Sequence, residues 1–598
     1  MTDDRRLRSD ERPTKYILFT WLAISALLTV IAWPKISQGR FPGSDDSLRL
    51  VQVRDLLAGQ GWYDLHQYRI APPDGVLMHW SRLVDAPLYL SIRALEPLVG
   101  QALAEQITVI AIPLLILGLI CLLIGRLAWR VFDVETAVFA CLAFAMWPLA
   151  LKQVQPMRID HHAYQMLCVA IAAWALTWRS GLRGGAAAGV GMGIGAMVSL
   201  ETLPMAAGFG LVLLIRWLRD PQMRWWLVGY MQGLALTLVI LFALTRGLPD
   251  LAEHCDVISP AHIGFFLITA LATGAIAAPR SLPRAAVLTL FAIAGLGGLI
   301  FFGLTAPNCL GSPFGDFDPL VHQFWYQNVL EGQPLWRQTL EDAIPAMAQA
   351  LVALAASILI FTRQRDWLRH WWGEYSILML VAIVAGALTF RSFAFVGVLG
   401  AVPLGWLTLQ MLRRFRSAGS LLAKAGMAVL IYFVLLPSAP FVVMQKLGPS
   451  ENAASEPLTT LQSSCDIYNN IPLLDRLPPA RIVAPFDVGS SVLHLTRHSV
   501  VATSHHRAQK PMRDVILTFT SPPEQSRKII NEYGAQYVVV CMDLYEPANF
   551  IAIGGDQSLM ARLEADDAPG WLERVEIGGP EALRVWKVRP GGIPSPGR

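Results

Sequence analysis

The chain has 598 residues, of which 54% are hydrophobic and only 15% are charged. Soluble domains contain about 25% charged residues, so this composition excludes an ordinary soluble protein and indicates a polytopic membrane protein. The formal net charge of +4 is too small to indicate nucleic-acid binding, and the sequence has no basic stripe with interleaved aromatic residues.

A basic N-terminus leads into an apolar run at residues 16–34. This run is too long for the apolar part of a signal peptide, and no small-residue cleavage site follows it, so we expect a retained first membrane helix. Windows of about 19 residues predict about thirteen membrane helices in total. The remaining expected helices lie at 104–125, 134–151, 163–178, 184–200, 203–217, 226–245, 261–278, 285–305, 343–361, 376–390, 392–412 and 424–443.

Alternate loops between these helices carry the positive charge, for example 126–130, 216–224 and 413–416. The positive-inside rule places these loops, and residues 1–15, in the cytoplasm. The transmembrane domain is then expected at 16–443, with an inner N-terminus and an outer C-terminus. Its long loops on the outer face are expected at 35–103, 152–162 and 306–342.

The tail, residues 444–598, is a different kind of sequence. Polar residues dominate from Glu451 onward. Strand-like runs at 481–484 and 536–541 alternate with helical stretches at 511–519 and 523–533. This alternation predicts a small α/β domain outside the membrane.

Seven cysteines are spread singly along the chain, without the CxxC spacing of a metal site. We expect those inside spans, Cys121, Cys141 and Cys168, to pack in the core. The other four, Cys255, Cys309, Cys465 and Cys541, fall on the predicted outer side, where disulfides persist. The sequence leaves open whether Cys465 and Cys541 are bridged.

Acidic and imidazole side chains interrupt the apolar pattern on the predicted outer face, at Asp45 and Asp46, at Asp160 and His162, and at Glu331. Such groups are costly near a bilayer, which indicates a function. Because Asp160 and His162 lie two residues apart at the mouth of a span, both can face one cation. A carboxylate with an imidazole suits Mn²⁺, whereas carboxylates with water suit Mg²⁺. Capping of helix N-termini is the alternative interpretation of the aspartates.

In this order, the residues resemble the catalytic subunit of oligosaccharyltransferases, membrane glycosyltransferases of the class-C (GT-C) fold. Gly43-Ser44-Asp45 is similar to the family's first-loop Gly-Asn-Asp, and Asp160-His161-His162 matches its Asp-His-His variant. The resemblance implies that Asp45, Asp160 and His162 hold a divalent metal, Mn²⁺ or Mg²⁺. Further short matches are Pro73-Asp-Gly75, His79-Trp80 and Leu83-Val-Asp85.

Two later motifs extend the resemblance over roughly residues 16–540. Val329-Leu-Glu331-Gly-Gln333-Pro334 is similar to a Ser-Val-Ser-Glu-x-Gln-Pro stretch whose Glu serves the acceptor and the metal site. Arg391, at the outer end of a span, is similar to the arginine that holds the lipid-linked phosphate. Its guanidinium can donate two parallel hydrogen bonds to phosphate oxygens. The alternative interpretation is an arginine whose side chain only extends from the end of the span to the headgroup region.

The tail departs from the family at the acceptor motif. Where the family has Trp-Trp-Asp-Tyr-Gly, this chain has Pro485-Phe486-Asp487-Val488-Gly489. Without the two tryptophans, an Asn-x-Ser/Thr acceptor is not expected, and a lipid, glycan or other protein hydroxyl is favoured. Trp371-Trp372 repeats the two tryptophans of the family motif, but the pair lies in a predicted cytoplasmic loop and is interpreted as part of an aromatic belt at the membrane interface.

The remaining polar residues have weaker support. His505-His506-Arg507 is expected either to line the site and bind phosphate or to be a solvated loop. Glu201, between two spans near the outer face, is interpreted as a surface turn residue.

The resemblance implies a metal-assisted, inverting transfer of a sugar or glycan from a polyprenyl phosphate or diphosphate, at the periplasmic face of a bacterial inner membrane. Asp45, Asp46 and Glu331 are the expected catalytic residues, because Asp46 or Glu331 can accept the acceptor's proton. The expected substrate-binding residues are Arg391, His79, Trp80, Asp487 and Arg507. The chain is expected to act alone, without nucleic acid.

Three alternatives remain open at this stage. One is a class-C enzyme that modifies lipid A or cell-wall glycan, which only the acceptor would distinguish. A transporter would place acids near the middle of its spans, whereas here they lie at the ends. A non-catalytic envelope assembly protein is the third alternative.

Overall fold

The computed structural model of the protein describes residues 12–280, 282–311, 317–436 and 463–589. The chain divides into two compact units. The membrane unit comprises Met1–Trp33, Ser81–Gly315 and Leu330–Gly448. The C-terminal unit comprises Pro34–Trp80, Asp316–Val329 and Pro449–Arg598, so it is assembled from three separate stretches of the chain.

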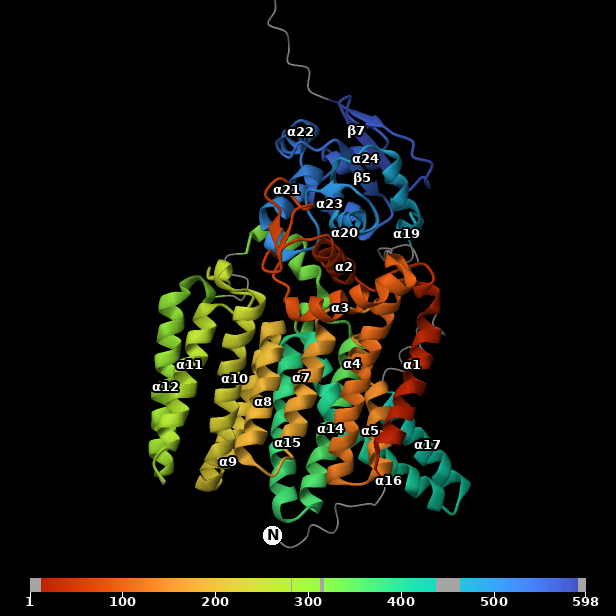
Figure 1. The fold of residues 1–598 in the computed structure, drawn as a ribbon. Helices are drawn as coiled ribbons and strands as arrows, with labels where there is room; N and C mark the ends of the chain where they lie inside the picture. Colours follow the sequence, from red (N-terminus) through yellow and green to blue (C-terminus); the bar gives the residue numbers. More distant parts are fainter. Residues whose placement is uncertain (1–11, 281, 312–316, 437–462, 590–598) are drawn as a thin grey trace, which may run out of the picture. The chain divides into compact units, whose positions relative to one another are not determined.

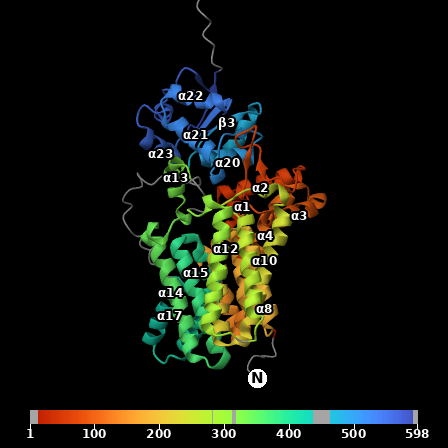
Figure 2. The same cartoon turned by 90° about the vertical axis from the view of Figure 1, so that its left-hand side faces the viewer.

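Most long helices of the membrane unit run side by side as a bundle in both views, whereas α3 lies across one end of it (Figure 1 and Figure 2). Short 3₁₀ turns, among them η1 (Leu200–Thr202), η6 (Leu330–Gly332) and η8 (Phe390–Ser392), lie at the helix ends. The helices are α1 (Thr14–Ile36), α3 (Arg82–Val99), α4 (Gln101–Val131), α5 (Val134–Ala145), α6 (Pro148–Lys152), α7 (His162–Ala175), α8 (Gly181–Val198), α9 (Leu203–Arg219), α10 (Arg224–Thr245), α11 (Pro260–Ala277), α12 (Arg284–Thr305), α14 (Leu340–Arg363), α15 (Asp366–Leu388), α16 (Phe393–Ser417) and α17 (Leu421–Leu435).

Among the described residues, nine helices are long and apolar enough to cross a membrane, and α5, α7 and α17 are shorter apolar helices. Each predicted span overlaps a helix, although residues 437–443 of the last one lie outside the described residues. The prediction of a polytopic helical membrane protein is therefore confirmed. The count of thirteen crossings stays a prediction.

Helix α16 forms the centre of this bundle. Its sequence is apolar on all sides, which is typical of a helix enclosed by others. In the span Phe390–Ser417, 94% of the most apolar window is buried. A Cβ atom at Gly405 would lie 2.5 Å from the backbone nitrogen of Ala140, so α16 and α5 are in backbone contact. Because α16 begins directly after η8, this packing holds Arg391 at one end of the bundle.

Helices α8 and α10 contact each other through glycines on both sides. A Cβ atom at Gly185 or Gly189 of α8 would lie 2.0 or 2.1 Å from a carbonyl oxygen of α10. The same holds in reverse for Gly229 and Gly233, at 2.3 and 2.6 Å from carbonyl oxygens of α8. Each helix thus presents two glycines four residues apart, the spacing that allows close approach of membrane helices.

The predicted position of Trp371 and Trp372 was wrong. Both lie inside α15 and are 3% and 0% exposed, not in a loop at the membrane interface. Charge near the start of the helix moved the predicted span to residue 376. The structure neutralises this charge, because buried Glu374 accepts hydrogen bonds from Arg216 and Arg219 of α9.

A five-stranded mixed sheet forms the core of the C-terminal unit, with the strand order β4-β3-β5-β7-β6. Strand β3 pairs in parallel with β4 and β5, with Ile482 opposite Val500 and Tyr537. Strands β5 and β7 are antiparallel, with Val538 opposite Trp586. The sheet strands are β3 (Arg481–Val483), β4 (Ser499–Val500), β5 (Tyr537–Cys541), β6 (Leu572–Arg574) and β7 (Leu583–Val588).

All residues of β5 are buried, as expected for a Val-rich strand covered on both faces. Helices alternate with these strands in the tail, so the predicted α/β domain is confirmed. The helices and the remaining hairpin of this unit are α2 (Ser44–Leu57), β1 (His66–Gln67), β2 (Val76–Leu77), α13 (Pro319–Phe324), α19 (Ile467–Asn470), α20 (Phe486–Leu495), α21 (Gln509–Thr520), α22 (Pro523–Glu532), α23 (Tyr545–Gly554) and α24 (Leu559–Glu564).

Two disulfides are formed. Cys465 is bridged to Cys541 at the end of β5, which settles the pairing that the sequence left open. The second bridge, Cys255–Cys309, joins the segment after α10 to the segment after α12. Three cysteines inside the helices are buried and free, as expected, namely Cys121, Cys141 and Cys168.

Candidate active site

The loop between α6 and α7 presents Asp160 at one end of the membrane bundle. Met157 adopts a left-handed backbone conformation, with φ of 71°, which costs a non-glycine residue about 1–3 kcal/mol. Its N–H donates to the carbonyl oxygen of Val109 on α4 at 3.0 Å. The next side chain, Arg158, donates from Nε to Oε1 of Gln153 at 3.2 Å and lies 3.8 Å from Asp160 Oδ2. The loop is thus held on both sides of the aspartate.

Asp160 and the two histidines after it form one buried group. The Nδ1 of His161 contacts Asp160 Oδ1, and the His161 backbone N–H donates to the same oxygen at 2.6 Å. The Nε2 of His162 lies 3.3 Å from the other oxygen, Oδ2. Each of the three residues is 8% exposed or less.

This group fits a divalent cation. Zinc-type cations bind imidazole nitrogen and carboxylate oxygen at about 2.0–2.2 Å, so two ligands of one ion lie roughly 3 Å apart, as Asp160 Oδ2 and His162 Nε2 do. The Nδ1 of His162 lies 3.0 Å from Gln165 Oε1, which selects the tautomer with an Nε2 lone pair. His161 orients the carboxylate from its far oxygen. The first and third residues of the triplet are therefore suitable ligands.

A row of side chains with alternating charge, Glu201, Arg391, Glu331 and Lys152, begins beside His162. The Nδ1 of His162 lies 3.8 Å from Glu201 Oε2, and Glu201 accepts a hydrogen bond from Nη2 of Arg391. The other arm of Arg391, Nη1, lies 3.8 Å from Glu331 Oε1, and Lys152 Nζ lies 4.0 Å from Oε2 of the same glutamate. The backbone also helps, since Phe390 N–H donates to Gln333 O at 3.0 Å. Each buried charge thus has an opposite charge beside it, which offsets the cost of burial.

The surroundings keep both loop carboxylates ionised. Burial alone would raise the pKa of Asp160, but the imidazoles of His161 and His162 and the Arg158 guanidinium hold it well below its ordinary value. Burial likewise opposes ionisation of Glu331, yet Arg158, His162 and Arg391 together lower its pKa. Both carboxylates are therefore ionised at neutral pH.

An apolar groove of about 390 Å³ between α9 and α15 ends at this charged group. Glu201 and Ser392 line one end of the groove, and the rest is mainly aliphatic. Its side chains Leu380, Val384 and Leu388 are 51–58% exposed, so the groove is open along the outside of the bundle.

The C-terminal unit holds the other predicted site residues. Asp45 and Asp46 lie in the first turn of α2, where the helix N-terminus favours negative charge, and Asp46 is fully buried. Ser504 Oγ donates to Ser44 Oγ at 2.9 Å, so the start of α2 lies beside the segment that leads to His505. The predicted metal ligands thus fall in different units, and their joint site stays a prediction.

Three imidazoles gather in this same unit. The Nδ1 of His79 lies 2.8 Å from Nε2 of His505, and the His506 ring centroid lies 4.5 Å from that of His79. Trp80 packs edge-on against His505, and the buried Arg49 guanidinium lies 4.7 Å from the Trp80 ring centroid. His505 is 2% exposed, so it is not part of a solvated loop. Arg507 follows directly in the turn that leads to α21.

Asp487 is exposed in the first turn of α20, and the residue before it belongs to the core. Phe486 is 1% exposed and packs against Phe324. The backbone N–H groups of Phe486 and Asp487 donate to the two carboxylate oxygens of Glu546, both at 3.0 Å. Burial, together with nearby Asp487, raises the pKa of Glu546 well above its ordinary value. A distant acid therefore caps the helix that carries Asp487.

Sequence reasoning named Asp160, His162, Glu331 and Arg391, which the structure brings into one row, but it missed other members of this group. Glu201 was interpreted as a surface turn residue, yet it lies between His162 and Arg391. A usable signal was its position, an acid in a very short turn between two apolar helices. Gln165 and Glu546 were not considered, because their roles depend on contacts that no local motif shows.

No protein-family model and no curated protein sequence matches the chain. Solved structures do match. The apo oligosaccharyltransferase of Archaeoglobus fulgidus aligns with a TM-score of 0.65 and 13% identity, over 92% of this chain and 72% of its own. The archaeal oligosaccharyltransferase AglB of A. fulgidus, in complex with an inhibitory peptide and a dolichol-phosphate, aligns with a TM-score of 0.64 and 12% identity, over 94% of this chain and 72% of its own.

A further structure of the A. fulgidus oligosaccharyltransferase, in complex with zinc and sulfate, aligns with a TM-score of 0.60 and 14% identity, over 92% of this chain and 70% of its own. At such low identity the likeness concerns the fold. It extends over the membrane helices and the C-terminal sheet alike. The chain therefore has the fold of an archaeal oligosaccharyltransferase, which confirms the class-C fold expected from its short motifs.

Proposed function

We propose that this chain is a membrane glycosyltransferase that moves a sugar or glycan from a polyprenyl-linked phosphate to a hydroxyl acceptor. One observation carries the proposal. In the membrane unit, the Asp160–His162 pair and the Glu201–Arg391 pair lie next to each other at the head of an open apolar groove. A lipid-linked phosphate needs both a chain-binding groove and a charged end. The A. fulgidus neighbour that carries a dolichol-phosphate supports this choice of donor.

The residues of the membrane unit would have separate roles in metal binding and phosphate binding. Asp160 and His162 would hold a divalent cation with Asp45, which would neutralise charge on the departing phosphate. The proposed metal is Mn²⁺ or Mg²⁺; the zinc of the neighbouring structure supports a divalent site. Arg391 would contact the phosphate oxygens, since its guanidinium fork suits that geometry. Glu201 holds Arg391 in place and thus acts as a positioning residue.

The reaction is a single inverting displacement. The acceptor oxygen forms a bond to the anomeric carbon, and the bond from that carbon to the phosphate oxygen breaks, with both electrons leaving on the phosphate. The hydroxyl proton goes to a carboxylate, either Glu331 or Asp46. Glu331 is ionised at neutral pH, although the cations that lower its pKa also make it a weaker base.

The C-terminal unit would supply the remaining contacts. His79, Trp80, His505 and Arg507 would bind polar groups of the donor, because imidazole and guanidinium N–H groups donate to phosphate oxygens. Asp487, exposed at the start of α20, would face the acceptor. Phe486 is buried in the core, which supports an acceptor other than an Asn-x-Ser/Thr peptide.

The proposed location is a bacterial inner membrane, with the site and the C-terminal unit on the periplasmic side. Basic residues at the opposite helix ends support this orientation, for example Arg219 at the end of α9 and Arg284 at the start of α12. The chain is proposed to act alone. Transfer to lipid A or cell-wall glycan remains the nearest alternative.

The test is release of sugar from defined donors by the purified protein. Polyprenyl monophosphate and diphosphate sugars would be supplied separately, with and without a chelator. We expect donor consumption that stops on metal removal and returns with Mn²⁺ or Mg²⁺. Failure of every lipid-linked donor, with metal present and the protein folded, would reject the proposal. Mass analysis of membrane extracts would then identify the acceptor.

A further inference from the structure

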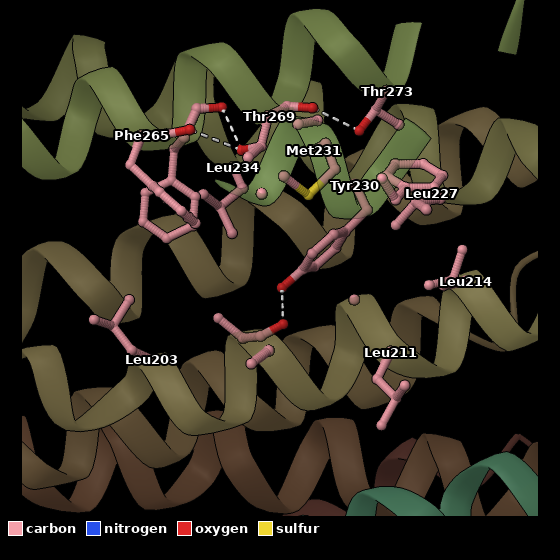
Figure 3. Close-up of a pocket in the computed structure, with 17 residues that line it drawn as sticks. Leu203, Leu211, Leu214, Leu227, Tyr230, Met231, Leu234, Phe265, Thr269 and Thr273 are labelled. Atoms are coloured by element: carbon pink, nitrogen blue, oxygen red, sulfur yellow. Dashed lines mark hydrogen bonds between the residues drawn. The ribbon is translucent and has the colours of Figure 1, made fainter. Parts of the chain in front are cut away.

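A second apolar cavity lies between α9, α10, α11 and α12, with a volume of about 440 Å³ (Figure 3). It is separate from the groove that ends at Glu201. The two cavities use different residues of α9: Leu203 and Ala206 line this one, whereas Pro204 lines the groove beside α15. Leu211, which also lines the second cavity, is 46% exposed, so the cavity opens to the outside of the bundle.

The lining offers no spare hydrogen-bonding side chain. Among its residues only Tyr230, Thr269 and Thr273 carry hydroxyl groups. Tyr230 donates to Ala206 O at 2.6 Å, Thr269 to Phe265 O at 2.9 Å and Thr273 to Thr269 O at 2.7 Å, as the dashed lines in Figure 3 show. A polar ligand would lose its hydrogen bonds to water here without replacement. A hydrocarbon chain would lose none.

The dimensions suit one lipid tail. Along α9 the lining runs from Leu203 to Leu214, which corresponds to about 16 Å at 1.5 Å per residue. This length is roughly half of the hydrocarbon core of about 30 Å, so the cavity covers about one leaflet. Helix α12 contributes one wall of the cavity through Phe291, Ala294 and Gly295, and only 11% of its most apolar stretch is buried by protein. Hydrocarbon in the cavity would cover the inner side of this sparsely packed helix.

Basic residues surround one end of the cavity. Arg224 begins α10 three residues before the lining residue Leu227, and α12 begins at Arg284, seven residues before the lining residue Phe291. Arg224 Nε donates to Ala277 O, the last residue of α11, at 3.1 Å. Arg280 follows α11, and both it and Arg284 are exposed. This end is the predicted cytoplasmic one, where arginines attract anionic headgroups.

We propose that this cavity binds one acyl chain of an anionic phospholipid from the cytoplasmic leaflet, with the headgroup at Arg280 and Arg284. The polyprenyl donor is not the proposed occupant, because its phosphate is needed at Arg391, which is at the other end of the bundle. The bound lipid is a structural component that fills the space between α9–α10 and the α11–α12 pair. This inference goes beyond the proposed transfer reaction, and only the exclusion of the polyprenyl donor rests on the role proposed for Arg391.

Two glycines on α12 give a matched test. Gly295 lines the cavity, Gly297 does not, and a Cβ atom at either would meet nothing within 4 Å. Gly295→Leu therefore fills the cavity without a backbone clash, and Gly297→Leu adds the same side chain on the outside. The purified full-length variants would be incubated with phosphatidylglycerol or phosphatidylethanolamine, and bound lipid would be counted by native mass spectrometry.

We expect the wild type and Gly297→Leu to retain one phosphatidylglycerol per chain and Gly295→Leu to retain less than a tenth of that amount. Replacing Arg280 and Arg284 with Gln should remove the preference for phosphatidylglycerol. Equal lipid retention in both leucine variants would overturn the proposal, as would displacement of the lipid by polyprenyl phosphate. If Gly295→Leu does not fold, Gly210→Ala tests the same cavity, because its Cβ would meet Tyr230 Cε1 at an ordinary 3.7 Å.

Discussion

The two units each hold a histidine cluster, and the two clusters differ in their partners. In the membrane unit, the imidazoles of His161 and His162 face the Asp160 carboxylate. In the C-terminal unit, His79, His505 and His506 face one another. A carboxylate beside an imidazole balances the charge of a divalent cation. Three imidazoles without a carboxylate can hold a metal ion when they are neutral and can donate to an anion when they are protonated. We therefore expect the Asp160 cluster to hold the proposed metal and the His79 cluster to contact the donor phosphate.

The largest effect should come from removing the carboxylate. Asp160→Asn keeps the shape but removes the charge that would bind the cation, so we expect a loss of about 10²–10³ in the rate of donor consumption, as for one preorganised electrostatic contact. The rate of donor consumption, measured at increasing metal concentrations for the wild type and Asp160→Asn, would give this loss. Asp556→Asn, an exposed aspartate of the C-terminal unit, is the control. Wild-type turnover in a correctly inserted Asp160→Asn protein would refute the metal assignment.

The second-largest loss of activity should come from replacing Arg391. Charge-assisted hydrogen bonds contribute about 1.5–3 kcal/mol, so Arg391→Gln should lower kcat/KM for the donor about ten- to a hundredfold. Arg391→Lys should recover only part of this loss, since lysine cannot extend two arms toward Glu201 and Glu331. Arg363→Gln, at the far end of α14, is the matched control. Equal activity of the Lys and Arg proteins would show that charge alone suffices.

The histidine cluster of the C-terminal unit should have a smaller effect. Removing one hydrogen bond of about 0.5–1.5 kcal/mol in His505→Gln should raise KM for the donor about three- to tenfold. The metal concentration that gives half-maximal activity should not change. A shift in metal dependence instead would mean that this cluster binds the cation, and the contrast between the two clusters would fail.

The smallest effect concerns the stability of the C-terminal unit. Unfolded Glu546 ionises near pH 4.3, whereas burial raises its pKa in the folded protein. Between the unfolded-state pKa and the folded-state pKa of Glu546, the folded protein therefore binds a proton that the unfolded chain does not bind. The resulting contribution to the free energy of unfolding is fully present below the unfolded-state pKa and is lost as pH rises through the folded-state pKa. Thermal unfolding from pH 5 to pH 8 should show this slope in the wild type.

Glu546→Gln should flatten that slope, because glutamine cannot ionise. Glu532→Gln, an exposed glutamate at the end of α22, should leave the slope unchanged. Identical slopes in the two variants would show that another group is responsible.

The sequence predicted what depends on local pattern. Apolar windows located the helices, and the Val-rich run at β5 located the central strand, because burial imposes a composition that is visible along the chain. The triplet at Asp160 was visible for the opposite reason, since polar residues are rare beside spans. Contacts between distant segments were not visible. The Glu201–Arg391 pair joins residues 190 positions apart, and although the short turn marks Glu201 as unusual, nothing in the local sequence identifies Arg391 as its partner.

Glu374 shows how a contact with a distant segment led to the wrong predicted position of Trp371 and Trp372. A charged residue lowers the mean hydropathy of the segment around it, so the span predicted at 376–390 began after Glu374. In the folded protein two arginines of α9 cancel this charge, so the helix extends through Trp371 and Trp372. Glu546 is a similar case, because a helix cap supplied from 60 residues away leaves no trace in the capped segment.

The glycine contact between α8 and α10 has a consequence for how this protein tolerates variation. A single methyl group at Gly189 would meet the backbone carbonyl oxygen of Tyr230, which no rotamer change can relieve. Since α8 ends just before the turn that carries Glu201, separating the two helices would also displace that glutamate. A complete mutational scan should therefore show that Gly189, which is far from any reacting group, does not tolerate even alanine without loss of activity.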